Sequence, residues 1–469
     1  MFKDFAGMSQ APPPFYLGFA SSALQMEGAN ATDGRGPSIF NTAESLPGHG
    51  DTSAVADDFY HLYPIDIAAM QLLGVKHFRL SISWSRIIPD GDGAVNQKGL
   101  DFYARLLDAL RAAGIEPLVC LYHWDLPQAL QSNFGGWASD QIVPAFVNYA
   151  RVVFQALGDK SVYWSTVNEP INFCFLHYAA GMSPLFIHDL RQAWNCSYNV
   201  LRAHAAAVKE FRAAVPGGRI SMCLNSEWGQ PLTNSTADAD AAQRRMEYEL
   251  GMFADPIYKG DYPASMKQRI SFLPKITPQL AHDLNGSMDY FGLNFYTAVY
   301  VAADEGATCL WGPCDFTTSQ TDKAGNLIGA EADSSWLKFT PWAFRPILNW
   351  ISNRYHPKEI VVTETGWDVK GEDAMPLAQA LNDTSRSNFF RDYIPQAADA
   401  VNIDKVPMTG YFVWSLLDNY KFGSYAIRFG VAHVDYKIKQ RTFKASAMYL
   451  AGIFNSSMAN ESLTYPAVA

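Results

Sequence analysis

The sequence predicts an α/β fold, a (β/α)8 barrel formed by a single domain with extended loops after its strands. Three observations support this class: eight short β-rich apolar segments occur along the 469 residues, helical patterns separate most of them, and no low-complexity linker or fixed-period repeat divides the chain. Eight alternating β and α elements in one undivided stretch are typical of a closed parallel barrel. We expect one domain over residues 1–469, with a core at about 12–455 and a short polar C-terminal tail.

The eight strands are expected where apolar, β-branched and aromatic residues cluster. They are predicted at residues 15–20, 77–82, 116–122, 161–167, 219–224, 289–295, 359–363 and 409–414. Apolar residues recur every three or four positions from Gly99 to Ala113, which predicts an amphipathic helix with Gly114 as its C-terminal cap. The connections at about 305–335 and 366–385 are expected to be loops, and long loops that follow barrel strands lie at the catalytic end of the fold.

Composition and charge limit the partners of the protein. The formal net charge of -10 provides no basic surface for a phosphate backbone, so no nucleic acid is expected to bind. No apolar stretch approaches the ~20 residues that cross a bilayer, so no membrane partner is expected. The segment that begins at Met1 lacks the apolar region of a signal peptide, which favours a cytoplasmic location. The oligomeric state is left open by the sequence.

Sequons and cysteines bear on the compartment. Asn-x-Ser/Thr sequons begin at Asn30, Asn195, Asn234, Asn285, Asn382, Asn455 and Asn460. Chance would give roughly two or three, so secretion is a second possibility. Cys120, Cys174 and Cys223 lie in apolar runs and are expected to be inert core thiols, whereas Cys309 and Cys314 could close a small loop disulfide.

Polar and aromatic side chains gather at or just after the C-terminal ends of the predicted strands. They are Gln25, Glu27, Arg79, His123, Trp124, Asp125, Asn168, Glu169, Asn225, Asn294, Tyr296, Glu364 and Trp414. In a parallel barrel these strand ends surround one opening, where barrel enzymes place their chemistry. Glu169 and Glu364 each follow a buried apolar run, and the two runs are expected on facing sides of the barrel.

Two carboxylates with amide, imidazole and indole neighbours indicate glycoside hydrolysis. No His, Cys or Asp cluster has metal-ligand spacing, so neither a metal nor a cofactor is expected. Glycoside hydrolysis needs one protonated carboxyl group to assist the leaving group and one ionised carboxylate to meet the oxocarbenium-like centre. Arg79 and the Tyr296 hydroxyl would favour the charged form of Glu364, whereas Glu169, beside the neutral Asn168, is expected to have a raised pKa.

The sequence resembles glycoside hydrolase family 1, a family of retaining β-glucosidases and β-galactosidases, from Phe15 to about Leu450. The motifs that carry the resemblance are Gln25-Met-Glu-Gly, Asp33-Gly-Arg-Gly-Pro-Ser-Ile, Phe78-Arg-Leu-Ser-Ile-Ser-Trp-Ser-Arg, Leu121-Tyr-His-Trp-Asp-Leu-Pro, Asn168-Glu-Pro, Phe253-Ala-Asp-Pro-Ile-Tyr-Lys-Gly-Asp-Tyr-Pro, Gly292-Leu-Asn-Phe-Tyr-Thr and Trp414-Ser-Leu-Leu-Asp-Asn. So many matches in one order make the resemblance highly specific.

The resemblance implies a role for each candidate residue. Glu169 would be the general acid/base and Glu364 the nucleophile. Glycone contacts are implied for Gln25, His123, Trp124, Asn168 and Trp414, with Asn168 near the 2-hydroxyl. Asn294 and Tyr296 would support the nucleophile, and Trp336 would form the aromatic platform for the aglycone.

The sequence departs from this family after Trp414. The family typically has Asn-Phe-Glu-Trp, and this chain has Asn419-Tyr420-Lys421-Phe422, which exchanges a carboxylate acceptor for a cationic donor. Three interpretations remain open: Lys421 turns out to solvent while another acceptor serves the sugar, it donates to hydroxyls or leaves room for a 6-deoxy sugar, or it pairs with an anionic substituent. A smaller departure is Thr365 in place of the usual Asn after the nucleophile.

We therefore expect a retaining exo-β-glycosidase of the β-glucosidase type that acts on a small β-glycoside or an oligosaccharide. Two alternatives are kept. One is a β-glycosidase with an altered glycone preference, for a fucoside, a galactoside or an anionic sugar, because of Lys421. The other is a non-catalytic sugar-binding relative.

Overall fold

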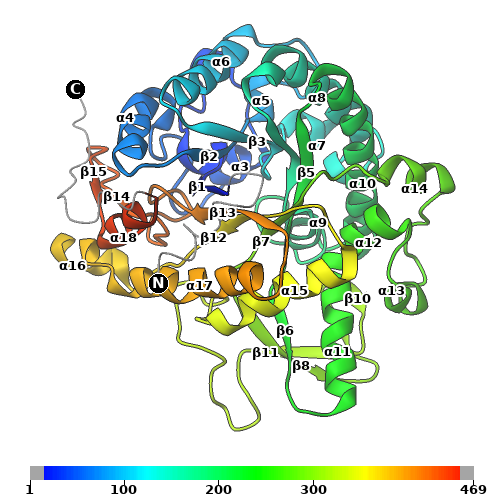
Figure 1. Ribbon diagram of the computed structural model, residues 1–469. Coiled ribbons are helices and arrows are strands. Elements are labelled where there is room, and N and C mark those ends of the chain that lie inside the picture. Colours follow the sequence, from blue (N-terminus) through cyan, green and yellow to red (C-terminus); the bar gives the residue numbers. More distant parts are fainter. Residues whose placement is uncertain (1–14, 455–469) are drawn as a thin grey trace.

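A closed barrel of eight parallel strands forms the centre of the protein (Figure 1). A computed structural model describes residues 15–454. The barrel strands are β1 (Tyr16–Ala20), β2 (His77–Ser81), β3 (Glu116–Tyr122), β4 (Tyr163–Asn168), β5 (Arg219–Asn225), β7 (Phe291–Asn294), β12 (Ile360–Thr365) and β13 (Met408–Trp414). They pair in the order β1-β13-β12-β7-β5-β4-β3-β2, which closes the sheet on itself. The predicted fold and all eight predicted strands are confirmed.

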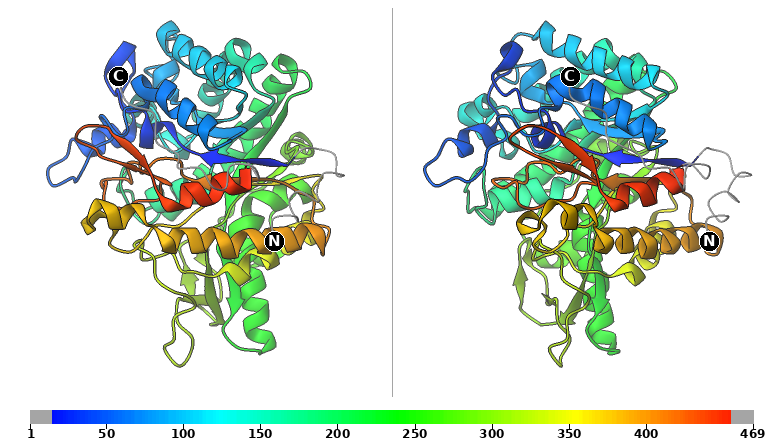
Figure 2. Two further views of the ribbon diagram at one scale, coloured as in Figure 1. Left: turned by 60° about the vertical axis from the view of Figure 1, so that its left-hand side comes forward. Right: turned by 90° about the vertical axis from the view of Figure 1, so that its left-hand side faces the viewer.

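Helices surround the barrel on its outer side (Figures 1 and 2). They include α4 (Phe59–Leu72), α6 (Gln97–Ala112), α8 (Ile142–Leu157), α10 (Leu190–Ala214), α12 (Met252–Lys259), α15 (Phe344–Tyr355), α17 (Thr384–Asn402) and α18 (Ala445–Phe454). Helix α6 confirms the pattern from Gly99 to Ala113, and Gly114 follows it with a φ of 73°, a left-handed conformation that glycine adopts without strain.

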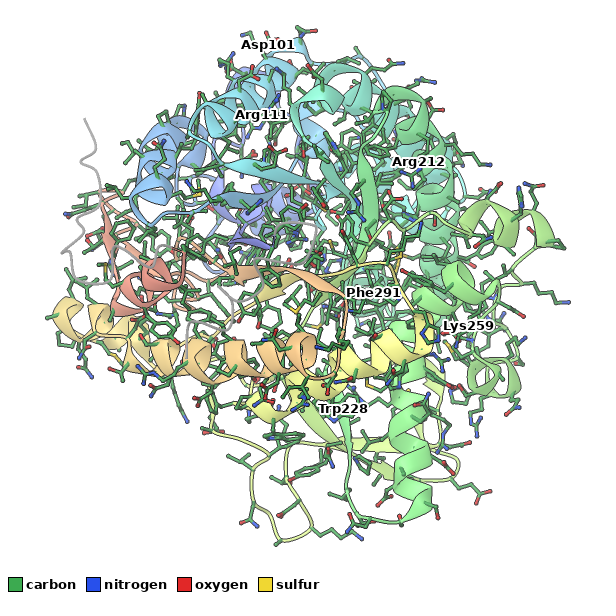
Figure 3. The ribbon with its side chains drawn as sticks, in the orientation of Figure 1. Asp101, Arg111, Arg212, Trp228, Lys259 and Phe291 are labelled. Atoms are coloured by element: carbon green, nitrogen blue, oxygen red, sulfur yellow. A yellow bond between two sulfur atoms is a disulfide. The ribbon has the colours of Figure 1, made fainter. Side chains whose placement is uncertain are left out.

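Helices and strands bury their apolar faces against one another. Phe291 on β7 is fully buried, whereas Asp101 and Arg111 lie on the exposed surface of α6 (Figure 3). Further helices fill the connections: α2 (Ala23–Met26), α3 (Ile39–Glu44), α5 (Trp84–Ile87), α7 (Gln128–Phe134), α9 (Pro170–Tyr178), α13 (Ala264–Arg269) and α14 (Pro278–Leu284). No helix of residues 15–454 is long and apolar enough to cross a membrane.

The predicted loops at 305–335 and 366–385 are partly structured. In the first, β9 (Thr308–Cys309) pairs with β10 (Gly312–Pro313), and β11 (Phe316–Ser319) joins a separate sheet. That sheet also contains β8 (Ala298–Ala303) and β6 (Trp228–Pro231), and together with α11 (Thr236–Met246) it projects from the barrel (Figure 1). The second contains the short helix α16 (Leu377–Leu381). Another small sheet pairs β14 (Ala432–Val434) with β15 (Arg441–Phe443).

Two expectations about the cysteines are wrong. Cys174 is not a free core thiol, because it forms a disulfide with Cys196. Helix α9 packs on α10 and brings the two Cα atoms within 5.5 Å, a tertiary contact that the local sequence does not reveal. Cys309 and Cys314 are free thiols instead of a disulfide, and each donates to a backbone carbonyl at 3.4 Å, Cys309 to Gly312 and Cys314 to Phe316.

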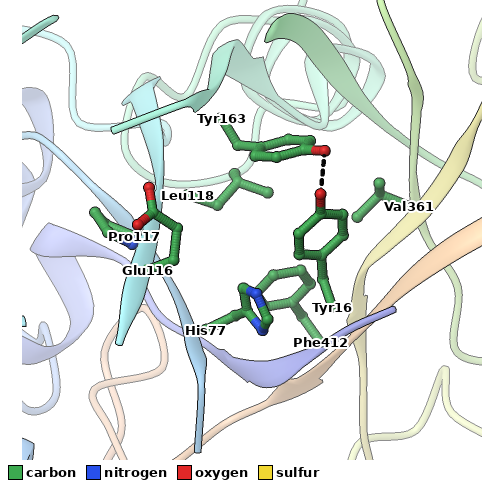
Figure 4. A pocket seen from close by; sticks show the side chains of 8 residues that line it. All are labelled: Tyr16, His77, Glu116, Pro117, Leu118, Tyr163, Val361 and Phe412. Carbon is green, nitrogen blue, oxygen red and sulfur yellow. Dashed lines mark hydrogen bonds between the residues drawn. The ribbon is translucent and has the colours of Figure 1, made fainter. Parts of the chain in front are cut away.

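A small pocket lies at the N-terminal end of the barrel (Figure 4). It is lined by Tyr16, His77, Glu116, Pro117, Leu118, Tyr163, Val361 and Phe412. The Tyr163 hydroxyl donates to the Tyr16 hydroxyl across it at 2.6 Å. Tyr16 and Tyr163 begin β1 and β4, so this pocket is at the opposite end from Glu169, which directly follows β4. This end of a barrel usually contributes to stability, whereas the active site lies at the C-terminal end.

Candidate active site

Glu169 and Glu364 lie at the C-terminal end of the barrel, where both strands depart from regular pairing. The register between β4 and β5 shifts between Ser165 and Asn168, directly before Glu169. The register between β12 and β7 shifts before Glu364, which places Glu364 opposite Asn294. Such irregularities redirect side chains near active sites. Here they occur on the two strands whose ends carry the glutamates.

Two donors hold the carboxylate of Glu364. Nη1 of Arg79 donates to Oε1 at 2.5 Å, and the Tyr296 hydroxyl donates to Oε2 at 2.9 Å. Arg79 is fully buried and Glu364 is 4% exposed. A buried arginine and a hydroxyl donor both favour the ionised form of a carboxyl group. The two residues that the sequence placed beside Glu364 therefore both contact its carboxylate.

Glu169 has neutral donors instead of a cation. Nδ2 of Asn294 donates to Oε1 at 2.8 Å and Nδ2 of Asn172 donates to Oε2 at 2.9 Å. Burial, and next the negative charge of Glu364, raise the pKa of Glu169 to about 7, while the two amides oppose that rise. A carboxyl group with such a pKa is partly protonated at neutral pH. The raised pKa expected for Glu169 is therefore present, whereas the side chain of Asn294, expected to support Glu364, contacts Glu169 instead.

Asn168 and Asn294 join the two glutamates in one hydrogen-bond network. Nη2 of Arg79 donates to Oδ1 of Asn168 at 2.5 Å. Nδ2 of Asn294 also donates to Oδ1 of Asn168, at 3.0 Å. Oδ1 of Asn294 accepts from the Thr363 hydroxyl at 2.6 Å, which fixes the orientation of this amide. An unbroken chain of contacts therefore connects Glu364 to Glu169 through Arg79, Asn168 and Asn294.

An aromatic wall lies beside this network. The His123 ring stacks on Trp414, with ring centroids 5.8 Å apart. Nε2 of His123 lies 3.1 Å from Nδ2 of Asn168, and Nε1 of Trp124 donates to the backbone carbonyl of Asn168 at 3.1 Å. Burial, followed by the charges of Arg79 and Lys421, lowers the pKa of His123 well below its usual range. The imidazole is therefore neutral and adds no charge to the wall.

Trp336 lies at the edge of the site. Its side chain is among the exposed aromatic ones, at 43% exposure, and its ring meets Tyr296 edge to face at 5.6 Å. Because Tyr296 contacts Glu364, Trp336 is one residue removed from the candidate nucleophile. An exposed indole in this position is available to stack on a ligand.

Gln25 contacts the loop that carries Lys421. Nε2 of Gln25 donates to the backbone carbonyl of Tyr420 at 2.9 Å, and the backbone carbonyl of Gln25 accepts from Tyr420 N–H at 3.0 Å. Phe422 stacks on Trp124 with centroids 5.0 Å apart. Nζ of Lys421 lies 4.4 Å from the centroid of the Trp414 ring. The side chain is thus directed toward the aromatic wall, so the interpretation in which it turns out to solvent is wrong.

The sequence did not single out Asn172 and Thr363. Asn172 follows Glu169 by three residues in α9, so one helical turn brings its amide back to the carboxyl group. That spacing was a usable signal. Asn172 also accepts from Nδ2 of Asn225 at 3.2 Å, which ties the acid/base candidate to the end of β5. Thr363 had no such signal, because its contact with Asn294 joins neighbouring strands.

Comparison with known proteins assigns the chain to a family. The sequence model described as Glycosyl hydrolase family 1 matches residues 8–458. The chain belongs to glycosyl hydrolase family 1. This family 1 protein is 38% identical over 472 residues to "Beta-glucosidase 34" of Oryza sativa subsp. japonica, covering 95% of this chain and 92% of the relative. It is 39% identical over 480 residues to "Beta-glucosidase 1B" of Phanerodontia chrysosporium, covering 98% and 88%.

Solved structures agree with that assignment. The β-glucosidase of the fungus Humicola insolens, crystallised in complex with glucose, has a TM-score of 0.92 and 41% identity to this family 1 protein, over 95% of this chain and 98% of that one. The β-glucosidase of Trichoderma harzianum has a TM-score of 0.90 and 40% identity, over 94% and 96%. Within residues 15–454, no group of three or more His, Cys, Asp or Glu residues could hold a metal ion.

Proposed function

We propose that this family 1 glycoside hydrolase is a retaining exo-β-glycosidase of the β-glucosidase type, with Glu364 as nucleophile and Glu169 as general acid/base. The observation that carries the assignment is the difference between the two carboxyl groups: Glu364 contacts a buried arginine, whereas Glu169 contacts only amides and has a pKa of about 7. The β-glucosidase names of the relatives from rice and from Phanerodontia chrysosporium support the glycone assignment.

The proposed reaction has two steps. In the first, an oxygen of Glu364 attacks the anomeric carbon, the bond to the aglycone oxygen breaks, and that oxygen takes the proton of Glu169. In the second, the carboxylate of Glu169 takes a proton from water, which attacks the anomeric carbon and releases Glu364. Two displacements at one carbon retain its configuration. Asn168, His123, Trp124, Trp414 and Gln25 would orient the glycone, and Trp336 would stack on the aglycone.

Substitution of Glu364 tests the nucleophile. Glu364→Gly should abolish hydrolysis of an aryl β-glucoside, and added azide should restore consumption of the substrate and give the glycosyl azide of inverted configuration, because the small anion fills the space of the lost carboxylate. Nuclear magnetic resonance of the product identifies its configuration. Wild-type rates in Glu364→Gly would exclude this role and with it the proposed mechanism.

Substitution of Glu169 tests the acid/base. Glu169→Ala should retain far more activity on an aryl glycoside with a good leaving group than on a disaccharide, because a good leaving group needs little protonation. The ratio of kcat/KM for the two substrates measures this difference. Equal losses on both substrates would contradict the assignment. Detectable wild-type hydrolysis of an aryl β-glycoside also separates this function from a non-catalytic sugar-binding role.

We propose a secretory location for the protein in place of the cytoplasmic one. The Cys174–Cys196 disulfide is typical of an oxidising compartment. The asparagines of three sequons, Asn234, Asn285 and Asn382, are exposed. Mass spectrometry of the protein from its natural source, with and without peptide N-glycosidase, tests this location. Unmodified asparagines together with free Cys174 and Cys196 would contradict this proposal and support a cytoplasmic location.

A further inference from the structure

A short turn carries Trp336 at the edge of the candidate active site. Leu337 N–H donates to the Ser334 carbonyl at 3.0 Å, which closes the turn around Trp336. The indole is exposed, and it meets the ring of Tyr296, whose hydroxyl donates to Glu364. The position of the indole relative to Glu364 therefore depends on the contacts that hold this turn.

Asp368 holds the first half of the turn. Its Oδ2 accepts from Ser334 N–H at 2.8 Å and from the Ser334 hydroxyl at 2.5 Å. Ser334 precedes Trp336 by two residues, and Asp368 follows Glu364 by four residues on the segment that leaves β12. The two hydrogen bonds therefore attach the turn of Trp336 directly to the segment that follows the candidate nucleophile.

Thr297 and Gln320 hold the rest of the turn. Lys338 N–H donates to Oγ1 of Thr297 at 3.0 Å, and Oγ1 of Thr297 donates to the Lys338 carbonyl at 2.8 Å. Thr297 directly follows Tyr296 in the sequence. On the other side, Nε2 of Gln320 donates to the backbone carbonyl of Trp336 at 3.2 Å. These contacts place the indole through its backbone, and none of them is made by the indole itself.

Burial makes a carboxyl group costly at position 368. Asp368 is fully buried, and its second oxygen, Oδ1, has no hydrogen-bond partner among residues 15–454. Burial raises the pKa of Asp368, while the two donors of Ser334, and next the charge of Lys421, oppose that rise. A buried oxygen without a donor costs free energy of folding. The contact with Ser334 is therefore what this acid contributes at its position.

We propose that Asp368 is a positioning residue that sets the indole of Trp336 for aglycone binding and so favours β-glycosides with an aromatic aglycone. The inference rests on the proposed function, in which Trp336 stacks on the aglycone. Stacking requires two rings to lie at a defined distance and offset, so a turn that moves loses the contact even though the indole is still present. Asp368 acts through Ser334 and the turn, not by contact with the substrate.

The test measures the preference for an aromatic aglycone in matched variants. The substrates are benzyl and methyl β-D-glucoside, whose leaving groups are both unactivated alcohols and which differ by a phenyl ring. Asp368→Ala should lower the benzyl-to-methyl ratio of kcat/KM by roughly 3- to 10-fold, mainly through KM of the benzyl glucoside, because a stacked contact is weakened. Trp336→Ala should lower the ratio at least as much. Equal losses on both substrates in Asp368→Ala would leave the ratio constant and would overturn the proposal.

A double variant separates positioning of the indole from a general effect on the fold or on Glu364. In the Trp336→Ala background, Asp368→Ala should leave the ratio unchanged, because no indole remains to be placed. A further decrease by the same factor as in the single variant would show that Asp368 acts independently of Trp336, against the proposal. Asp368→Asn keeps an oxygen acceptor for Ser334 and should restore most of the ratio. Asp240→Ala removes an exposed acid on α11 and is the control with an unchanged ratio.

Two further measurements keep the proposal testable if the Asp368 variants do not fold or the methyl glucoside reacts too slowly. Ser334→Ala removes the hydroxyl contact to Asp368 and keeps the backbone contact, so the ratio should fall by a smaller factor of roughly 2, and an unchanged ratio would overturn the proposal. Benzyl and methyl 1-thio-β-D-glucoside, as inhibitors of 4-nitrophenyl β-D-glucoside hydrolysis, give the same ratio from binding alone. No hydrolysis of any aryl β-glycoside by the wild type would refute the proposed function, whereas a ratio that depends on Trp336 and not on Asp368 would overturn only this inference.

Discussion

Replacement of Asn172 by alanine should move the pH dependence of catalysis to higher pH. Nδ2 of Asn172 donates to Oε2 of Glu169 at 2.9 Å, and this bond lowers the pKa of Glu169 against the effect of burial. A hydrogen bond to a charged group contributes about 1.5–3 kcal/mol. One pKa unit corresponds to about 1.4 kcal/mol. The pKa of Glu169, about 7 in the wild type, should therefore rise by roughly one to two units.

The assay is kcat/KM against pH with a disaccharide, whose leaving group needs protonation. The general acid must hold its proton, so activity decreases as pH rises through the pKa of Glu169. In Asn172→Ala this alkaline limb should lie at higher pH than in the wild type. Asn225→Ala, which removes a contact to Asn172 and none to Glu169, should cause a smaller shift. Exposed Asn353 on α15 provides the matched control.

An unchanged alkaline limb in Asn172→Ala would refute the reasoning, and so would a limb at lower pH. The first result would mean that the amide does not affect the ionisation of the general acid. The second would mean that it favours the protonated form. A glycoside with a good leaving group serves as an internal comparison, because its alkaline limb should depend less on Glu169.

Three further predictions concern stability and the buried ion pair. Glu169→Gln should stabilise the fold by up to about 3 kcal/mol at pH 8 and much less at pH 4, because the raised pKa of Glu169 makes the folded wild type lose stability as pH rises from about 4 to about 7. Thermal unfolding at both pH values measures this difference, and an equal gain in stability at the two pH values would contradict it. Replacing Cys174 and Cys196 by alanine should lower the free energy of unfolding by about 3 kcal/mol, because the disulfide closes a loop with a sequence separation of 22. Urea unfolding measures this loss, and a loss no larger than that caused by replacing one unpaired cysteine would refute the prediction. Arg79→Met should reduce kcat by at least 100-fold and destabilise the fold by about 3–5 kcal/mol, since it leaves the carboxylate of Glu364 buried without its cation. A wild-type kcat in this variant would show that the hydrogen bond from Tyr296 alone is enough to hold Glu364 for catalysis.

Much of the fold followed from local patterns, for a physical reason. The barrel strands are buried, so each appears in the sequence as a short apolar run, and the helices between them bury one face and show a helical period. Polar residues at the ends of such runs stand out against the apolar residues before them. In a parallel barrel these ends surround one opening, so the polar residues lie close together there. The position of Glu169, Glu364 and Arg79 at the barrel opening was therefore predictable before any contact was known.

The remaining features depend on which elements pack together. The Cys174–Cys196 disulfide requires α9 to lie on α10, and neither cysteine differs locally from a buried thiol. The free state of the Cys309 and Cys314 thiols at the β9–β10 hairpin is likewise not visible in the local sequence. Short-range sequence carries little information on such contacts, because packing and register join residues that are distant in the chain or depend on one-residue shifts.

The sequence alone determined the barrel and the place of the two glutamates at its opening, because these follow from the buried apolar runs and from the residues that end them. Only the tertiary structure decided what Lys421 faces. Its neighbours in sequence allowed a position in solvent or in the site, and the choice came from the turn held by Gln25 and from the rings of Trp414 and Phe429. A side chain with four rotatable bonds has no preferred direction of its own, so its surroundings determine its direction.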